Sequence, residues 1–345
     1  MHEVFDATAA WYREGVPFAL VHVTKVFGSA PRLPGVAMAV AASGEVVGSV
    51  SGGCIEGAVY EECLLVLENQ QPASHTYGVT DDDAFAVGLT CGGDIDIFIE
   101  PVDGEHHPQF LDVVTAVQGG EPTAAATVIR GDSIGAHAIV TATGATGEPV
   151  LAERARSMLE RGATGLVDDE LFVETFTAPA RLIVFGATDF ARALVSAAKL
   201  LGYHVTVCDA RPVFATSTRF PDADEVVVEQ PFRYLQNTSI DSRTVLCVLT
   251  HDPKFDVPLL EVALRSPVGY IGALGSRRTH EDRLARLRAA GMSDDEIARL
   301  RSPIGLDLGA STPEETAVSI LAEVIAARRA ASGQPLAATF GPIHS

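Results

Sequence analysis

One stretch of the chain constrains the fold more than any other. Residues 181–209 read RLIVFGATDFARALVSAAKLLGYHVTVCD, an apolar strand pattern, a glycine turn, an amphipathic helix pattern and a second apolar strand pattern. This order opens a doubly wound α/β fold. Because 345 residues are enough for two domains, we predict a Rossmann-type parallel-sheet domain over residues 179–345 and a separate domain over residues 1–178.

The last long helix of the predicted second domain is marked at both ends. Thr312 and Glu315 have the spacing of a capping box, and Pro313 suits the first helical position. Arg328 and Arg329 suit the negative end of the helix dipole. The sequence therefore predicts a helix from Thr312 to about Arg329.

The first domain has a different pattern. FALVHVTKV reads as a strand, VAMAVAA and VVGSVS read as a hairpin, and DIDIFIE alternates so that Ile95, Ile97 and Ile99 share one face. We expect these strands and a single helix, which begins near residue 54, in the first hundred residues. Residues 108–176 mix helix and strand patterns and carry no functional signal. The prediction is a mixed α+β domain.

A cysteine stands between two glycines and the predicted helix, in SGGCIEGAVYEE. Apolar residues recur at helical spacing from Ile55 onward, which places Cys54 on the first turn. Such a thiol is either a small buried hydrophobe or a reactive group. The Ser51, Gly52 and Gly53 amides are expected to be uncovered at the positive end of the helix, where they would suit an anion. A second thiol, Cys91, precedes a glycine pair in TCGG.

The dinucleotide fingerprint of the second domain is incomplete. A GxGxxG turn lets backbone amides approach a pyrophosphate, but after Gly186 this chain has Thr188 at the second glycine position and the acidic Asp189 beside it. Asp209 follows at the end of the second strand, where an acid meets a ribose hydroxyl. The incomplete glycine pattern disfavours dinucleotide binding. The alternative to a nucleotide-binding domain is a Rossmann-type domain whose cofactor site is degenerate or empty.

Further polar residues follow later strands of this domain, where such folds bind ligands. His251 comes after one strand and suits proton transfer, although a hydrogen-bonded structural histidine is an equal alternative. Ser276 and Arg277 come after the next strand and suit an anion. Surface salt bridges are the alternative interpretation of the arginine.

Charge and composition exclude several classes of function. The chain has 25 basic and 45 acidic residues, a formal net charge of −20, which disfavours binding to nucleic acid or to an anionic membrane. No apolar run approaches the roughly 20 residues of a membrane span, and the first residues do not read as a secretory signal. We expect a cytoplasmic protein. The five cysteines have neither disulfide nor zinc spacing, and we expect Cys63, Cys208 and Cys247 to be core residues.

Several motifs in order resemble the XdhC/CoxI family of molybdenum-enzyme maturation factors. They are GSAPRLPG, SGGCIEGAV, TCGGDIDIFIEP, VCDARP, THD, GALGSRRT and IGLDLGASTPEE. The resemblance implies a factor that binds molybdenum cofactor, protects it or promotes its sulfuration, and delivers it to a xanthine dehydrogenase or carbon monoxide dehydrogenase apo-enzyme. It also implies a homodimer and leaves open a cysteine desulfurase as a partner.

The resemblance places the cofactor in the first domain. A carrier of this cofactor needs a soft sulfur ligand for the metal and a pocket for a phosphate. We expect Cys54 and Cys91 to be metal ligands, and Arg32 and the Ser51 to Gly53 amides to hold the phosphate. The residues expected to assist from the second domain, where a nucleotide site stays open, are Gly186, Asp209, His251, Ser276 and Arg277.

Two rival hypotheses remain. The first is an NAD(P)-dependent oxidoreductase that uses Asp209 for the ribose and His251 for proton transfer. The second is a sulfur-transfer enzyme that carries a persulfide on Cys54. The incomplete glycine fingerprint counts against the first rival.

Overall fold

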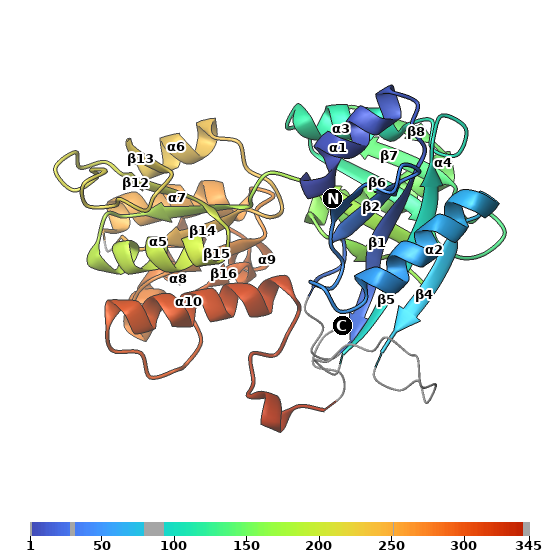
Figure 1. Ribbon diagram of the computed structural model, residues 1–345. Coiled ribbons are helices and arrows are strands. Elements are labelled where there is room, and N and C mark those ends of the chain that lie inside the picture. The colour runs from blue at the N-terminus through green and yellow to red at the C-terminus, as the bar shows by residue number, and fades with distance from the viewer. Residues whose placement is uncertain (1, 28–31, 79–92, 251, 341–345) are drawn as a thin grey trace. The chain divides into compact units, whose positions relative to one another are not determined.

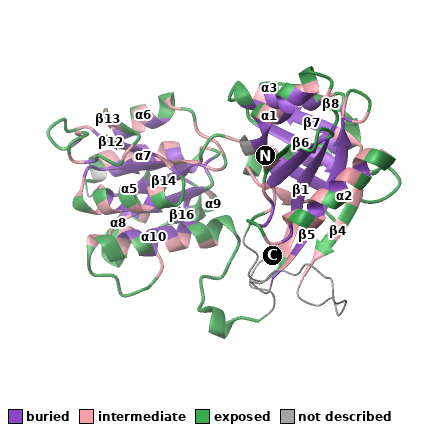
Figure 2. Cartoon of the chain, viewed as in Figure 1, coloured by how far each residue is buried: buried purple, intermediate pink, exposed green. Residues whose placement is uncertain are grey.

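The computed structural model describes residues 2–27, 32–78, 93–250 and 252–340. Contacts divide the chain into two units, one that ends at Ala178 and one that begins at Pro179 (Figure 1). Each unit has its own buried core, as the concentration of buried residues in the strands of Figure 2 shows.

The first unit contains two antiparallel five-stranded sheets, in the orders β3-β2-β1-β5-β4 and β8-β7-β6-β10-β9. Its strands are β1 Phe18–Phe27, β2 Ala37–Ala41, β3 Val46–Gly48, β4 Ala73–Tyr77, β5 Asp94–Val102, β6 Thr123–Val128, β7 His137–Thr141, β8 Ala145–Gly147, β9 Gly165–Leu166 and β10 Leu171–Phe176. Its helices are α1 His2–Arg13, α2 Glu56–Asn69, α3 Phe110–Gln118 and α4 Pro149–Arg161.

Because side chains alternate along a strand, each sheet has one face that packs against a helix and one face that packs against the other sheet. In β5, Ile95, Ile97 and Ile99 pack in the cluster that α2 covers, as predicted. In the second sheet, the corresponding outer face packs under α4. The remaining faces of the two sheets meet each other, where Phe98 of β5 packs with Phe172 of β10. The unit is therefore four layers deep, with a helix outside each sheet.

The second unit is a parallel six-stranded sheet in the order β13-β12-β11-β14-β15-β16. Counted from β11, this is the 3-2-1-4-5-6 order of a Rossmann fold, so the predicted fold class is confirmed. Its strands are β11 Arg181–Phe185, β12 His204–Asp209, β13 Glu225–Val228, β14 Val245–Val248, β15 Tyr270–Ala273 and β16 Leu300–Arg301. Its helices are α5 Asp189–Leu200, α6 Pro231–Asn237, α7 Pro253–Leu264, α8 Arg277–Ala289, α9 Asp294–Ala298, α10 Pro313–Arg328 and the 3-10 turn η1 Leu336–Ala338.

Helices cover both faces of this sheet. Residues of α5 and α10 pack in one core cluster and residues of α6, α7, α8 and α9 pack in the other (Figure 1). The predicted capping box of α10 is present, with the Thr312 hydroxyl accepting from the Glu315 amide and the Glu315 carboxylate accepting from the Thr312 amide.

The prediction of a single helix in the first hundred residues is wrong, because α1 precedes β1. Val4, Phe5 and Ala9 of α1 are buried against the strands, at the spacing of a helical face. None of the helices in the described part of the chain is long and apolar enough to cross a bilayer.

Candidate functional site

Cys54 lies just before α2. The helix begins at Glu56 with Ile55 as its N-cap residue, so the expectation that Cys54 sits on the first helical turn is wrong by two residues. Its side chain is half-buried and packs against the core between α2 and the first sheet. The thiol is thus partly accessible at the positive end of a helix, which favours negative charge.

The loop before Cys54 is closed by a carboxylate from its own helix. Glu56 accepts hydrogen bonds from the backbone N–H groups of Ser51 at 2.8 Å, Gly52 at 3.0 Å and Gly53 at 2.8 Å. It also accepts from the hydroxyls of Ser49 at 2.7 Å and Ser51 at 2.6 Å. Burial alone would raise the pKa of Glu56, but the bonds from Ser51 and Ser49 outweigh it and lower the pKa to about 2.

These contacts change the expectation for the glycine pair. The Ser51, Gly52 and Gly53 amides were expected to be uncovered and ready for a phosphate, and in the structure Glu56 takes all three. The Ser51 hydroxyl accepts in turn from the Cys54 and Ile55 amides, at 3.0 and 3.1 Å. The amides of this loop form an anion-binding site, and the Glu56 carboxylate of α2 occupies it.

Of the other expected cofactor residues of this unit, the structure describes only Arg32. Arg32 is exposed in the loop before β2. Cys91 lies outside the described residues, as does His251 in the second unit.

Three other thiols are inert by burial, as predicted. Cys63, Cys208 and Cys247 are fully buried. Burial raises the pKa of Cys63 and of Cys208 to about 12, and it raises the pKa of Cys247 as well. Their thiolate forms are therefore scarce at neutral pH.

The turn after β11 contains the incomplete dinucleotide fingerprint. Gly186 has φ +109°, and a Cβ there would come within 3.1 Å of the Leu249 and Thr250 backbone, so glycine is required. Thr188 is the N-cap of α5 and its hydroxyl accepts from the Ala191 amide. Asp189 lies 3.7 Å from Arg219. A side-chain hydroxyl and a carboxylate thus stand where a pyrophosphate would approach the helix.

Asp209, at the end of β12, is only 4% exposed and is saturated with donors. One carboxylate oxygen accepts from the Ala187 amide at 2.8 Å and Arg211 Nη2 at 2.7 Å, and the other accepts from the Arg211 amide and Nε, both at 2.9 Å. Burial alone would raise the pKa of Asp209, but these bonds outweigh it and lower the pKa. Because a carboxylate offers about four acceptor positions, a ribose hydroxyl must displace a present donor.

A cavity of about 550 Å³ opens at the carboxyl ends of the strands. Its lining residues are Thr188, Asp209, Ala210, Arg211, Pro231, Thr250, Asp252 and Phe255. This is where Rossmann-type folds bind ligands. Ser276 and Arg277 are exposed at the start of α8, where the Ser276 hydroxyl accepts from the Thr279 amide as the N-cap.

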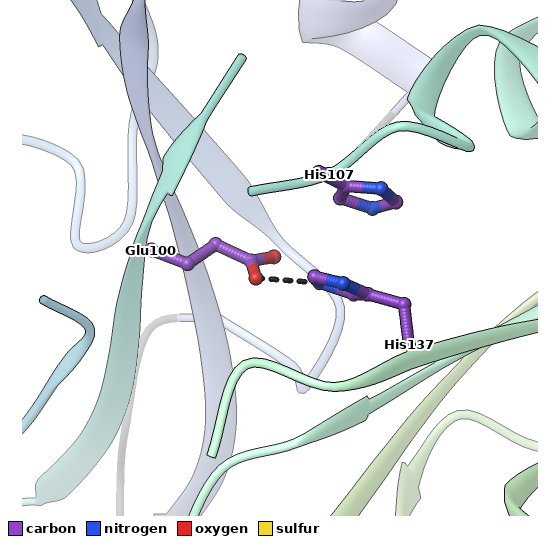
Figure 3. Close-up of side chains that lie close together, drawn as sticks. All are labelled: Glu100, His107 and His137. Carbon is purple, nitrogen blue, oxygen red and sulfur yellow. Dashed lines mark hydrogen bonds and ion pairs between the residues drawn. The ribbon is translucent and has the colours of Figure 1, made fainter. Parts of the chain in front are cut away.

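A second group of polar side chains, separate from the Glu56 loop, lies between the two sheets of the first unit and was not predicted from the sequence. It consists of His22, Glu100, His107, His137 and Glu174, all buried or nearly so. His137 Nε2 lies 2.7 Å from Glu100 Oε2, and the His107 ring stacks on the His137 ring with centroids 3.7 Å apart (Figure 3). His22 lies 3.6 Å from Glu100 and 3.4 Å from Glu174.

The charges of this cluster are set by burial and by the neighbouring groups. Burial alone would lower the pKa of His22, but Glu100 and Glu174 outweigh it and raise the pKa to about 9. Burial, helped by His137, lowers the pKa of His107 to about 3. The pKa of Glu100 is far below its usual range because its histidine partners outweigh burial.

The family comparisons match both units. The model of the XdhC and CoxI family matches residues 11–78 and the model of the XdhC Rossmann domain matches residues 182–324. The matched segments contain Cys54 with its loop, and Gly186 with Asp209.

Similar proteins cover almost the whole chain. A Bacillus subtilis protein named as a probable xanthine dehydrogenase component is 27% identical over 95% of this chain and 97% of its own length. The Escherichia coli molybdenum cofactor insertion chaperone PaoD is 27% identical over 90% of this chain and 83% of its own length. The Escherichia coli protein YqeB is 26% identical over 96% of this chain, which spans 47% of the length of YqeB.

A solved structure is similar over the same extent. The crystal structure of a Bacillus halodurans protein described as a xanthine dehydrogenase matches with a TM-score of 0.62 and 27% identity, over 97% of each chain.

Proposed function

This chain belongs to the XdhC and CoxI family, and we propose that it is a maturation factor that binds molybdenum cofactor and delivers it to a molybdenum hydroxylase apo-enzyme. The observation that carries the proposal is the similarity to a protein named as a molybdenum cofactor insertion chaperone, which extends over 90% of this chain and 83% of that protein. The cofactor is the cargo of such a factor, and the chain turns over no substrate of its own.

We place the metal end of the cofactor at Cys54. A thiol is the soft ligand that suits a sulfur-bound metal centre, and this thiol is half-buried at a helix N-terminus. Cys91 is the second proposed ligand. A partly shielded site of this kind also protects an oxidation-sensitive dithiolene from solvent.

The phosphate of the cofactor is proposed to replace the Glu56 carboxylate on the Ser51, Gly52 and Gly53 amides. Glu56 is on the first helical turn and only half-buried, so its side chain has room to rotate into solvent when another anion binds. Glu56 then acts as a built-in competitor, which keeps the loop ordered before loading. Arg32 is the proposed additional contact for the phosphate.

A nucleotide appended to the cofactor is a separate part of the proposal. The cavity at Asp209 and Thr250 is its proposed site, with Gly186, His251, Ser276 and Arg277 as the assisting residues. The rival function, an NAD(P)-dependent oxidoreductase, is favoured by the same cavity and by the Rossmann-type strand order. Both Thr188 and the occupied Asp209 carboxylate oppose it.

The partners of the chain follow from the same proposal. Sulfuration needs a sulfur donor, so a cysteine desulfurase is the proposed second partner, and the chain is proposed to act as a homodimer in the cytoplasm. Light scattering on the purified protein tests the dimer. Persulfide formation on Cys54 in the presence of a desulfurase tests the persulfide-carrier rival.

A transfer assay tests the proposed function as a whole. The cofactor-loaded protein is mixed with a cofactor-free molybdenum hydroxylase of the xanthine dehydrogenase class, and the two proteins are separated. We expect the pterin fluorescence to move to the hydroxylase together with enzymatic activity, faster than from an equal amount of free cofactor. Equal rates from loaded protein and free cofactor would show that the chain is not a delivery factor.

A further inference from the structure

The cluster between the two sheets is assembled from parts of the chain that are far apart. His22 follows Phe18 and Leu20 on the inner face of β1, and Glu100 follows Phe98 on the inner face of β5. The second sheet contributes His137 and Glu174 from β7 and β10. His107 comes from the segment between β5 and α3. Strand alternation therefore brings His22, Glu100, His137 and Glu174 into one buried space, which His107 joins from its loop.

Three of these residues have donor atoms close enough to share an ion. One ligand atom each of Glu100, His107 and His137 lies within 4.8 Å of the other two, and all three side chains are buried. Figure 3 shows Glu100 and His137 in contact with the His107 ring beside them. In the part of the chain that the structure describes, His107 Nδ1 has no hydrogen-bond partner. Buried nitrogen atoms rarely lack a partner.

The buried carboxylates of the cluster also suit a cation. Two carboxylates, Glu100 and Glu174, are buried here, and the described residues that line the adjoining cavity of about 10 Å³ include no Lys or Arg. Buried carboxylates need a compensating positive charge. His22 lies 3.6 Å from Glu100 and 3.4 Å from Glu174, and a metal ion bound to Glu100 would add a second positive group beside these carboxylates.

We propose that Glu100, His107 and His137 bind a divalent metal ion of the zinc type between the two sheets of the first unit. Two histidines and one carboxylate are a ligand set that zinc uses, and the site contains no thiol, which separates it from the proposed cofactor site at Cys54. The ion would join β5 to β7 and so tie the two sheets together.

The ring stack makes a specific demand on this site. The rings of His107 and His137 are nearly parallel, with an angle of 17° between their planes, so their in-plane lone pairs do not meet at one point. Zinc–nitrogen bonds of about 2.0–2.1 Å also require ligand atoms within about 4 Å of each other. Metal binding must therefore turn the His107 ring off the stack and draw the three ligands together by about 1 Å.

Metal analysis of the full-length protein tests the proposal. Because the site is buried, the ion must enter during folding, so the protein is refolded with Zn²⁺, desalted and analysed by mass spectrometry. The Cys54→Ala/Cys91→Ala background removes the two thiols of the proposed cofactor site as alternative ligands. We expect about one zinc ion per chain in this background and its loss in His107→Ala. His106→Ala is the matched control, since His106 is adjacent and bonds to Asp103 rather than to the cluster.

Cobalt provides a readout that does not depend on the His107→Ala variant. Refolding with Co²⁺ in the same background should give the visible absorption of a four- or five-coordinate ion with nitrogen and oxygen ligands. No retained zinc or cobalt in this background, or equal zinc retention by His107→Ala and His106→Ala, would overturn the proposal. The cluster would then be an ion-pair network balanced by protons alone.

Discussion

The Ser51 amide and hydroxyl both donate to the carboxylate of Glu56, at 2.8 and 2.6 Å. This pair closes the loop in front of Cys54 and fills the anion position that the glycine pair creates. In the proposed function the cofactor phosphate competes with Glu56 for the same amides. Removing the Glu56 carboxylate should therefore raise the affinity for the cofactor and lower the stability of the loop before Cys54.

Glu56→Ala should strengthen cofactor binding. The change frees the Ser51, Gly52 and Gly53 amides and removes a negative charge, and we expect roughly tenfold tighter binding, the value of about one charge-assisted hydrogen bond. Glu61→Ala is the control, because Glu61 is exposed on the same helix and its removal changes the net charge equally. Fluorescence titration with the cofactor measures the affinity of each variant. Identical affinities in the two variants would place the phosphate elsewhere.

Glu56 should also make the stability of the first unit depend on pH. Its folded pKa of about 2 is below the usual value of 4.5. The contribution of Glu56 to the free energy of unfolding is therefore complete above about pH 5 and is lost as the pH falls towards about 2. The difference in the free energy of unfolding between wild type and Glu56→Gln, measured in urea, should shrink over this range. A difference that stays constant with pH would contradict the assigned hydrogen bonds.

Thiol labelling should separate Cys54 from the core cysteines. In a Cys91→Ala background, alkylation of the native protein should modify Cys54 within the time in which Cys63, Cys208 and Cys247 remain unmodified, because those three are fully buried and have raised pKa values. Peptide mass spectrometry identifies the labelled residue, and labelling in denaturant provides the control. Simultaneous labelling of Cys54 and Cys63 would mean that Cys54 is not an accessible site.

Arg211→Ala should open the second unit to nucleotides. The change removes the Nε and Nη2 donors from Asp209, leaves the bonds from the Ala187 and Arg211 amides, and opens two acceptor positions of the carboxylate to a ribose. We expect NAD⁺ to bind roughly tenfold more tightly than to wild type, as for one charge-assisted hydrogen bond. Asp209→Asn in the same variant should abolish the gain. Tight NAD⁺ binding by wild type would instead revive the oxidoreductase hypothesis.

Local patterns predicted much of the fold. The 181–209 segment, the alternation of Ile95, Ile97 and Ile99, and the capping box of α10 all depend on residues near each other in the chain, and the structure confirms each. Helix α1 was missed although Val4, Phe5 and Ala9 have helical spacing. The contacts of Glu56 were not predicted either. The sequence shows that Glu56 follows Ser51 by five residues, but it does not show that the Glu56 side chain turns back to the Ser51, Gly52 and Gly53 amides.

The cluster between the sheets had no spacing motif in the sequence. The histidines at positions 22, 107 and 137 follow no metal-binding spacing, because the cluster residues meet only when two sheets pack face to face. A polar residue at an inward position of an apolar strand, such as His22 in FALVHVTKV or Glu100 in DIDIFIE, was the available clue. Such residues are rarely buried without a partner, although the sequence does not tell which partner.

The most direct test of the proposed function is the retention of molybdenum cofactor by purified protein after desalting, measured by fluorescence of the oxidised pterin. Wild type is compared with Cys54→Ala and with Cys63→Ala, which removes a buried thiol from α2, the helix that follows Cys54. We predict retention by wild type and Cys63→Ala and its loss in Cys54→Ala. No retention by wild type would contradict the cofactor-binding role itself, and equal retention by all three proteins would contradict the assignment of Cys54 as the metal ligand.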